Sequence, residues 1–244
     1  MRRPATIISL RALVLPAVAA LMLSTGTSAQ TCAITPSSDA LRQIVQCVSG
    51  GDCRGRRVVE RENLGPGCEA EIEVWSWHSA RRAVAIRDRK MCHSRRRSPP
   101  DPRFVHGLLL PVAQLCGVEE AALYASDGAH RHLWQDAWDA ARARLAEDEI
   151  VLAINPPTLR SQTHLHIHLM RGNGRPFPAS AEVVADLREV WAAADRAWRR
   201  DGGAAGRNYG IAVRKAGTGY AVAVEPGMPA NRANVEDRYG IAED

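Results

Sequence analysis

The sequence predicts an α+β fold, in which helices pack to one side of an antiparallel sheet. Short segments that alternate apolar and polar residues recur from residue 71 onward and indicate strands. Apolar residues at three- and four-residue spacing over 131–146 indicate an amphipathic helix. Tight turns at Pro156-Pro157 and at 217–219 favour antiparallel neighbours, which completes the α+β prediction.

The first 29 residues have the pattern of a secretory signal peptide. Two arginines precede an apolar stretch from Ala12 to Leu23, and small residues then suit cleavage before Gln30. The alternative is an uncleaved membrane anchor, but an apolar stretch of this length is well short of the roughly 20 residues of a spanning helix. We therefore expect 1–29 to be the signal and 30–244 to form a single domain.

Removal of the signal leaves about 215 residues, enough for one domain with a sizeable core. The formal charge then falls from +5 to +2, because the signal contains three arginines and no acidic residue. So small a charge gives no reason to expect nucleic acid as a partner.

All six cysteines lie in the first half of the mature chain. With an export signal, an even number predicts disulfides, and six cysteines allow 15 connectivities. A zinc site is the alternative, although no Cys-x-x-Cys pair is present. We expect the bonds to staple the N-terminal part onto the domain, with Cys92–Cys116 as the first pairing, because these two bracket the segment around His106. The six are Cys32, Cys47, Cys53, Cys68, Cys92 and Cys116.

The segments before residue 112 predict one helix, a tied loop and three strands. Ser37 or Ser38 could cap a helix that ends at Val48, and residues 49–69 read as a disulfide-tied loop. The basic segment 89–102 predicts a solvated loop, with contact to anionic headgroups or phosphates as the alternative. The expected strands are 71–77, 83–87 and 104–111.

The rest of the chain predicts two helices, two adjacent strands and a hairpin. The helix 131–146 carries Trp134 and Trp138 on its apolar face, and a second helix is expected over 181–199. The expected strands are 149–155 and 163–170, and the hairpin arms are 211–215 and 220–224.

Three histidines, His164, His166 and His168, alternate with aliphatic residues in the expected strand 163–170. Alternate residues of a strand share one face, so the three imidazoles should line one side of the sheet while the aliphatic residues face the core. Imidazole serves as nucleophile, acid or base, or metal ligand near neutral pH. The row therefore indicates a catalytic or a metal site, and the spacing alone favours neither.

The pattern His-φ-His-φ-His-φ-φ (φ apolar) over 164–170 resembles the signature of the histidine triad superfamily of nucleotide hydrolases and transferases. Asn155 and Ser161 stand where that superfamily has an asparagine after the preceding strand and a serine before the triad. The segment His106-Gly107-Leu108-Leu109-Leu110-Pro111 resembles the strand that carries its fourth histidine. The resemblance implies a HIT-like fold.

Within the superfamily, the chain is most similar to the CDP-diacylglycerol pyrophosphatases. The similarity covers roughly 38–242 and rests on Leu152–Asn155, Arg160–Gln162 and Leu165–His168, on the tryptophan helix and on Asn231-Arg232-Ala233. It departs from that family where members carry Gln and this chain has His106 and His164. The segment 53–102 also departs and contains an insertion.

The resemblance implies a covalent mechanism without cofactor or metal. His166 would attack a phosphorus atom, His168 would donate hydrogen bonds to phosphate oxygens, and His106 would stack beside His164. The neighbourhood of His164 would orient the attacking ring through its other nitrogen. The implied substrate-binding residues are Asn155, Ser161 and Gln162.

The function we expect is hydrolysis of CDP-diacylglycerol to CMP and phosphatidate through a nucleotidyl-histidine. One alternative is a histidine triad hydrolase of another nucleotide diphosphate or a phosphoramidate, which His106 and His164 favour. The other is a periplasmic zinc-binding protein that uses the three-histidine strand. We expect the protein in the periplasm or exported, with attachment to the inner membrane as a variant, and a membrane surface as a partner. The oligomeric state stays open.

Overall fold

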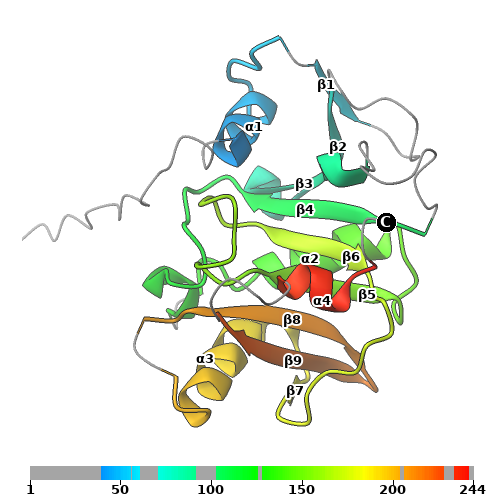
Figure 1. The fold of residues 1–244 in the computed structure, drawn as a ribbon. Helices are drawn as coiled ribbons and strands as arrows, with labels where there is room; N and C mark the ends of the chain where they lie inside the picture. Colours follow the sequence, from blue (N-terminus) through cyan, green and yellow to red (C-terminus); the bar gives the residue numbers. More distant parts are fainter. Residues whose placement is uncertain are drawn as a thin grey trace, which may run out of the picture. The chain divides into compact units, whose positions relative to one another are not determined.

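The computed structural model describes residues 40–55, 57–60, 71–91, 103–125, 128–203, 206–227 and 234–241 (Figure 1). The expected signal 1–29, the capping serines, most of the basic segment and Asn231-Arg232-Ala233 lie outside them. So does Cys92, and with it the expected first disulfide pairing. None of the helices in the described ranges is long and apolar enough to cross a membrane.

One nine-stranded sheet organises the described chain, with the strand order β1-β2-β3-β4-β6-β5-β8-β9-β7. Neighbouring strands are antiparallel except β1 and β2, which are parallel. The strands are β1 (Arg57–Glu60), β2 (Glu71–His78), β3 (Ala83–Arg87), β4 (His106–Pro111), β5 (Ile150–Ile154), β6 (Ile167–Arg171), β7 (Glu182–Val184), β8 (Tyr209–Ala216) and β9 (Gly219–Pro226).

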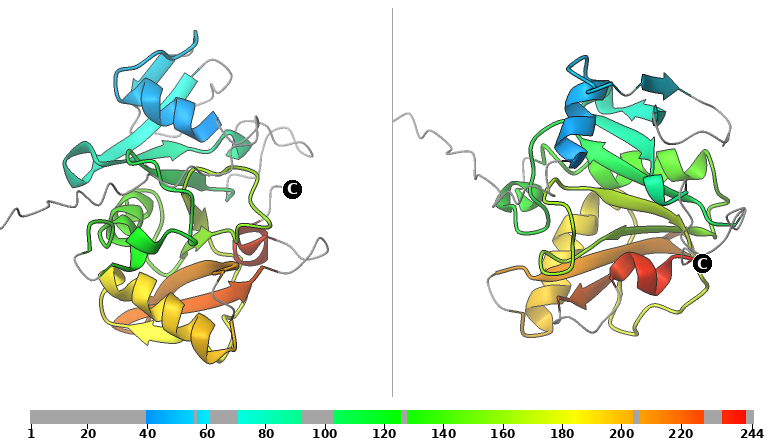
Figure 2. Two further views of the ribbon diagram at one scale, coloured as in Figure 1. Left: turned by 90° about the vertical axis from the view of Figure 1, so that its left-hand side faces the viewer. Right: turned by 45° about the horizontal axis from the view of Figure 1, so that its top comes forward.

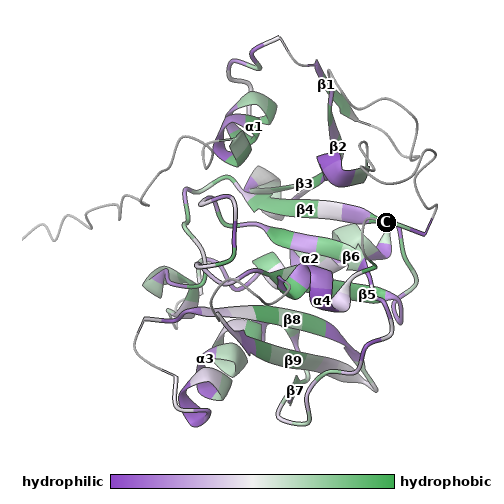
Figure 3. Ribbon diagram, in the orientation of Figure 1, coloured by the Kyte–Doolittle hydropathy of each residue, from purple (hydrophilic) through white to green (hydrophobic). Residues whose placement is uncertain are grey.

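Helices α2 (Leu133–Arg142) and α3 (Val190–Arg200) cover one face of this sheet. Their buried tryptophans Trp134, Trp138 and Trp191 pack on alternate strand residues such as Ile167 and Leu169. Period-two alternation along the strands and the helical spacing of the apolar residues together produce this main core. Figure 3 shows the result as strongly apolar central strands beside helices that carry both polar and apolar residues.

The opposite face carries two further helices, α1 (Ala40–Val48) and α4 (Val235–Tyr239) (Figure 2). The expectation that all helices pack to one side is therefore wrong. Its physical reason is visible in β4, where Leu108 and Leu110 are as buried as Leu109, which points the other way. A sheet that is apolar on both faces needs helices or loops packed on both of them. The candidate site lies on this second face, between α1 and α4.

Most expected elements are confirmed, with ends shifted by a few residues. The expected helix 181–199 is wrong in its first half, because 182–184 form β7 against β9 before α3 begins. Asp186 then accepts the backbone N–H of Arg188 and starts a new helical turn. The sequence interpretation also missed β1 and α4. Short 3₁₀ turns complete the fold: Ser79–Arg81, Arg89–Met91, Ala121–Tyr124 and Leu187–Glu189.

A disulfide joins Cys47, near the end of α1, to Cys53 in the following loop, with an S–S distance of 2.05 Å. Cys116 is disulfide-bonded as well. The expectation that bridges tie down the N-terminal part is supported by the first of these, since α1 covers one end of the functional site.

Candidate active site

The histidine motif does not lie wholly on a strand. β6 begins at Ile167, so His164 and His166 belong to the segment that leads into it, and His168 alone of the three is in the ladder. His166 and His168 line a common cavity. His164 does not line this cavity, and its Nε2 donates to the Pro111 carbonyl oxygen at 2.9 Å. Leu165, Ile167 and Leu169, which alternate with the histidines, all belong to the main core, as the expected alternation requires.

His166 is held as a neutral imidazole with one nitrogen committed to the backbone. Its Nδ1 donates to the His164 carbonyl oxygen at 2.8 Å, which leaves the proton-free Nε2 as the available atom. Burial, with a smaller contribution from His168, lowers the pKa of His166 to about 3. A proton-free ring nitrogen at neutral pH, at the wall of a cavity, is what a nucleophilic imidazole requires.

His106 stacks on His168 and not on His164 as expected. The ring centroids are 5.1 Å apart with an interplanar angle of 15°, and His106 Nε2 lies 3.0 Å from His168 Nδ1. The cause is strand direction: β4 and β6 are antiparallel, so the start of β4 faces the far end of β6, while Pro111 at the end of β4 meets His164. Burial lowers the pKa of His106 to about 4, despite the Asp88 carboxylate 3.3 Å away.

A buried carboxylate, Glu236 on α4, lies among these histidines. Its Oε2 is 2.9 Å from His168 Nδ1 and 3.4 Å from His106 Nε2, and the Lys90 ammonium is also at 2.9 Å. Burial opposes ionisation of this carboxyl, but His168, His106 and Lys90 outweigh it and hold its pKa well below the usual range. Glu236 also outweighs the partial burial of Lys90 and raises the pKa of that ammonium.

Asn155 connects Glu236 to the outer nitrogen of His168. Its amide nitrogen donates to Glu236 Oε1 and lies within hydrogen-bond distance of His168 Nε2, both at 3.2 Å, while its Oδ1 accepts the Glu236 backbone N–H at 3.4 Å. The carboxylate therefore fixes which way the amide points. With the amide nitrogen facing it, His168 Nε2 is an acceptor, so the ring proton sits on Nδ1 beside Glu236 and His106.

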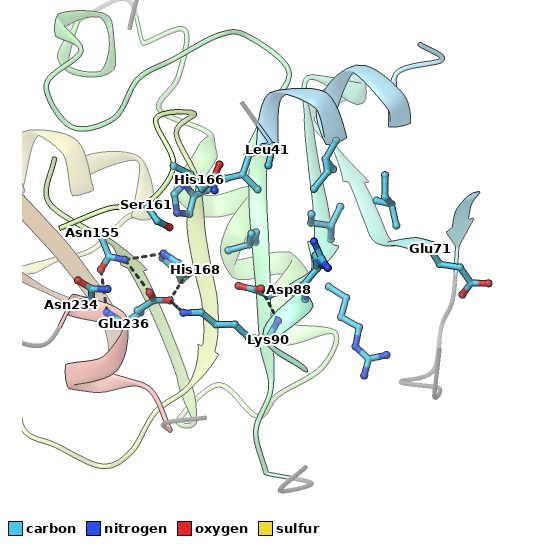
Figure 4. A pocket seen from close by; sticks show the side chains of 18 residues that line it. Leu41, Glu71, Asp88, Lys90, Asn155, Ser161, His166, His168, Asn234 and Glu236 are labelled. Carbon is cyan, nitrogen blue, oxygen red and sulfur yellow. Dashed lines mark hydrogen bonds and ion pairs between the residues drawn. The ribbon is translucent and has the colours of Figure 1, made fainter. Parts of the chain in front are cut away.

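The cavity beside these residues has a volume of about 250 Å³ (Figure 4). Asn155, Ser161, Gln162, His166 and His168 line it, so five of the seven expected site residues converge there. Ser161 is exposed, and the buried Gln162 Oε1 has no hydrogen-bond partner among the described residues. Polar atoms of this kind are available to a ligand. The remaining polar and charged lining is Glu71, Arg87, Asp88, Arg89, Lys90, Asn234 and Glu236.

One group in the described chain offers ligand atoms to a metal ion. Atoms of Asp88, His106 and His168 lie within 4.8 Å of one another. This is not the three-histidine strand proposed for zinc, because His164 bonds Pro111 and is absent from the group. The hydrogen bond between His106 and His168, and the Lys90 backbone N–H that donates to Asp88, already satisfy part of this cluster.

The sequence interpretation missed Asp88, Lys90 and Glu236. Asp88 and Lys90 lie within or beside a basic segment, and Glu236 belongs to a helix of five residues. Acidic and basic residues in such segments are normally on the surface. Only the tertiary pairing of α4 with β5 and β8 brings Glu236 to the histidines, and no local spacing reports it.

Comparisons with known proteins agree with this geometry. Residues 101–218 match the family model for CDP-diacylglycerol pyrophosphatase. The CDP-diacylglycerol pyrophosphatases of Mycobacterium bovis (strain BCG / Pasteur 1173P2) and Mycobacterium tuberculosis (strain ATCC 25177 / H37Ra) are each 44% identical over 69 residues, which cover 25% of this chain and 26% of theirs. A probable CDP-diacylglycerol pyrophosphatase of Mycobacterium leprae (strain TN) is 37% identical over 93 residues, covering 35% and 31%. The chain thus spans about a quarter to a third of the length of these relatives.

Proposed function

We propose that this chain, which belongs through residues 101–218 to the CDP-diacylglycerol pyrophosphatase family, hydrolyses CDP-diacylglycerol to CMP and phosphatidate. The observation that carries the proposal is the state of His166. It is a neutral imidazole whose Nδ1–H donates to a carbonyl oxygen and whose Nε2 is available at a cavity lined by hydrogen-bonding side chains.

In the first step, His166 Nε2 attacks the phosphorus that bears cytidine. A nitrogen–phosphorus bond forms, and the bond to the bridging oxygen breaks, so phosphatidate leaves as a phosphate anion that needs little protonation. The ring becomes positively charged, and its Nδ1–H still donates to the His164 carbonyl oxygen, 2.8 Å away. This carbonyl therefore both aims the nucleophile and stabilises the charge that develops on it.

In the second step, water attacks the same phosphorus and the nitrogen–phosphorus bond breaks. CMP leaves, His166 returns to its neutral form, and the proton lost by water goes to solvent or to the product phosphate. Splitting the displacement in two lets one imidazole serve as both nucleophile and leaving group.

His168 and Lys90 are the groups best placed to stabilise the phosphates. Both line the cavity and both contact Glu236, which raises the pKa of the Lys90 ammonium and so keeps it charged. We further propose that Asn155, Ser161 and Gln162 bind phosphate or ribose. A positioned donor of this kind contributes about 3 kcal/mol to transition-state stabilisation in other enzymes.

The HIT-like fold and the exported location are part of the same proposal. The antiparallel β4-β6-β5 core with the histidine segment entering β6 supports the fold assignment. The Cys47–Cys53 disulfide and the signal-like residues 1–29 support an oxidising compartment and, for a lipid substrate, a membrane surface as partner.

The proposal is tested with a panel of CDP-diacylglycerol, other nucleotide diphosphates and a nucleoside phosphoramidate, assayed in heavy-oxygen water with and without a chelator. We expect cleavage of CDP-diacylglycerol that survives chelation, with the label in CMP alone. Label in phosphatidate would mean attack on the lipid-side phosphorus. Preference for another substrate would support the broader histidine triad alternative, and loss of bound zinc together with activity would support the metal alternative.

A further inference from the structure

The cavity that holds His166 and His168 has a second, apolar half. Six aliphatic side chains line it, from α1 and from the same face of β2, β3 and β4 that carries His168 on β6. In Figure 4, Asn155 and Ser161 lie on one side of the two histidines, and Leu41 and Glu71 lie on the other. The aliphatic residues are Ala40, Leu41, Ile44, Ile72, Ile86 and Leu108.

The strand residues that line this half lie next to His168 in the sheet. Leu108 lies opposite His168 in the β4–β6 ladder, and Ile86 lies opposite Leu108 in the β3–β4 ladder. The three side chains form a row across the strands that runs about 10 Å, twice the spacing of neighbouring strands. Leu41 and Ile44 on α1 form the roof over this row, and both are almost fully buried.

Charge changes along the cavity in the order that a phospholipid requires. Asn155, Ser161 and Gln162 provide amide and hydroxyl groups at one end, and next to them Lys90 contacts Glu236 beside His168. The aliphatic side chains follow. In that order, the side chains suit the nucleotide, the phosphate and the hydrocarbon part of such a lipid.

We propose that the apolar half binds the glycerol-proximal part of one acyl chain, with Leu41, Ile44 and Leu108 as specificity-determining residues. This inference rests on the proposed function and adds the place where the lipid is recognised. The whole cavity, at about 250 Å³, is smaller than the site of a typical drug-sized ligand. It therefore holds only the beginning of a chain, and the remainder stays outside, in the membrane or micelle.

The test compares kcat/KM for short-chain CDP-diacylglycerol with kcat/KM for CDP-glycerol, which has the same diphosphate and no acyl group. Leu41→Phe places a larger side chain in the wall of the cavity. Val48→Phe is a similar change on the same helix, at a residue that does not line the cavity. We expect Leu41→Phe to lower the ratio of the two values about tenfold, and Val48→Phe to leave it unchanged. An unchanged ratio in a folded Leu41→Phe protein would overturn the inference while the proposed function stands.

A second measurement does not depend on the variants. Unmodified protein is photolysed with a CDP-diacylglycerol that carries a photoreactive group on the first carbons of its acyl chain. We expect attachment within 40–48 or on Ile72, Ile86 or Leu108, and attachment confined to other segments would overturn the inference. A protein that cleaves neither CDP-glycerol nor CDP-diacylglycerol would remove the proposed function itself, and the inference with it.

Discussion

The Glu236 carboxylate lies 2.9 Å from His168 Nδ1, although the two residues come from a short C-terminal helix and a central strand. Through its second oxygen and its backbone N–H, Glu236 also holds both ends of the Asn155 amide. One side chain thus sets the proton position of His168 and the orientation of its neighbour. Glu236 is a positioning residue, because its contacts are with His168, His106, Lys90 and Asn155.

Replacing this carboxylate by an amide of the same shape should impair turnover without unfolding the protein. We expect Glu236→Gln to lower kcat on the order of 100-fold, because the carboxylate that holds the His168 Nδ1 proton and the Lys90 ammonium at the site is lost. The pH dependence of kcat should shift as well, which a merely structural contact would not cause. The measurement is a pH–rate profile beside a thermal melt.

Glu225→Gln is the matched control for that variant. Glu225 accepts hydrogen bonds from Arg238 and Tyr239 and so anchors the same helix, but it contacts none of the histidines. Its amide variant should keep the wild-type pH profile even where stability falls. Equal pH profiles for Glu236→Gln and wild type would exclude the positioning role.

His166 lines the cavity and His164 does not, so the two should respond differently to substitution. His166→Ala should abolish turnover, and His166→Gly should regain part of it with added imidazole, because the cavity then holds a replacement nucleophile. His164→Gln should keep activity within a few fold of wild type. A glutamine amide can still donate to the Pro111 carbonyl oxygen, and the group that orients His166 is the backbone of residue 164.

These activities are measured by CMP release under saturating substrate. Loss of activity in His164→Gln as complete as in His166→Ala would mean that the His164 side chain acts at the site, contrary to its position outside the cavity.

Stability should fall in mild acid because His106, His164 and His166 are buried with lowered pKa values. The pKa values of His106 and His166 are about 4 and about 3, below the ordinary 6.5, so the unfolded chain binds more protons below pH 6.5. The stabilisation is complete above that pH and is lost as the pH falls toward the folded values. Each histidine contributes a slope of up to about 1.4 kcal/mol per pH unit in this window.

Urea unfolding at several pH values between about 7 and about 4.5 measures this slope. Glu236, whose pKa is also lowered, adds to the loss only below its ordinary value of 4.5. His166→Asn should therefore flatten the curve above pH 4.5. An identical slope in the variant and in wild type would contradict a neutral, buried His166.

The sequence predicted those parts of the fold that have a local signal. The apolar segments that form β3 and β4 and the helical spacing of Trp134 and Trp138 are such signals, and the structure confirms the two strands and the helix. The helix expected from 181 onward was wrong at its start, because Glu182–Val184 reads as helix until β9 offers an edge to pair with. Tertiary pairing decided that segment, not its own propensity.

The candidate site shows the same division. His166, His168, Asn155, Ser161 and Gln162 were predicted from one contiguous stretch, and the structure brings them to one cavity. The partners of His106 and His164 were wrong because they depend on the direction in which β4 pairs with β6. Glu236 could not be found at all, since it reaches the site only through the packing of α4 against β5 and β8.

The central claim is a covalent bond between His166 and the cytidine-bearing phosphorus, and trapping that intermediate tests it most directly. Enzyme mixed with CDP-diacylglycerol is quenched in alkali within one turnover, because nitrogen–phosphorus bonds of histidine persist there, and is then digested and analysed by mass spectrometry. We predict a cytidylyl group on the peptide 161–171, located on His166 and absent in His166→Gly. Turnover without any cytidylylated peptide, or with the group on His168, would contradict the account.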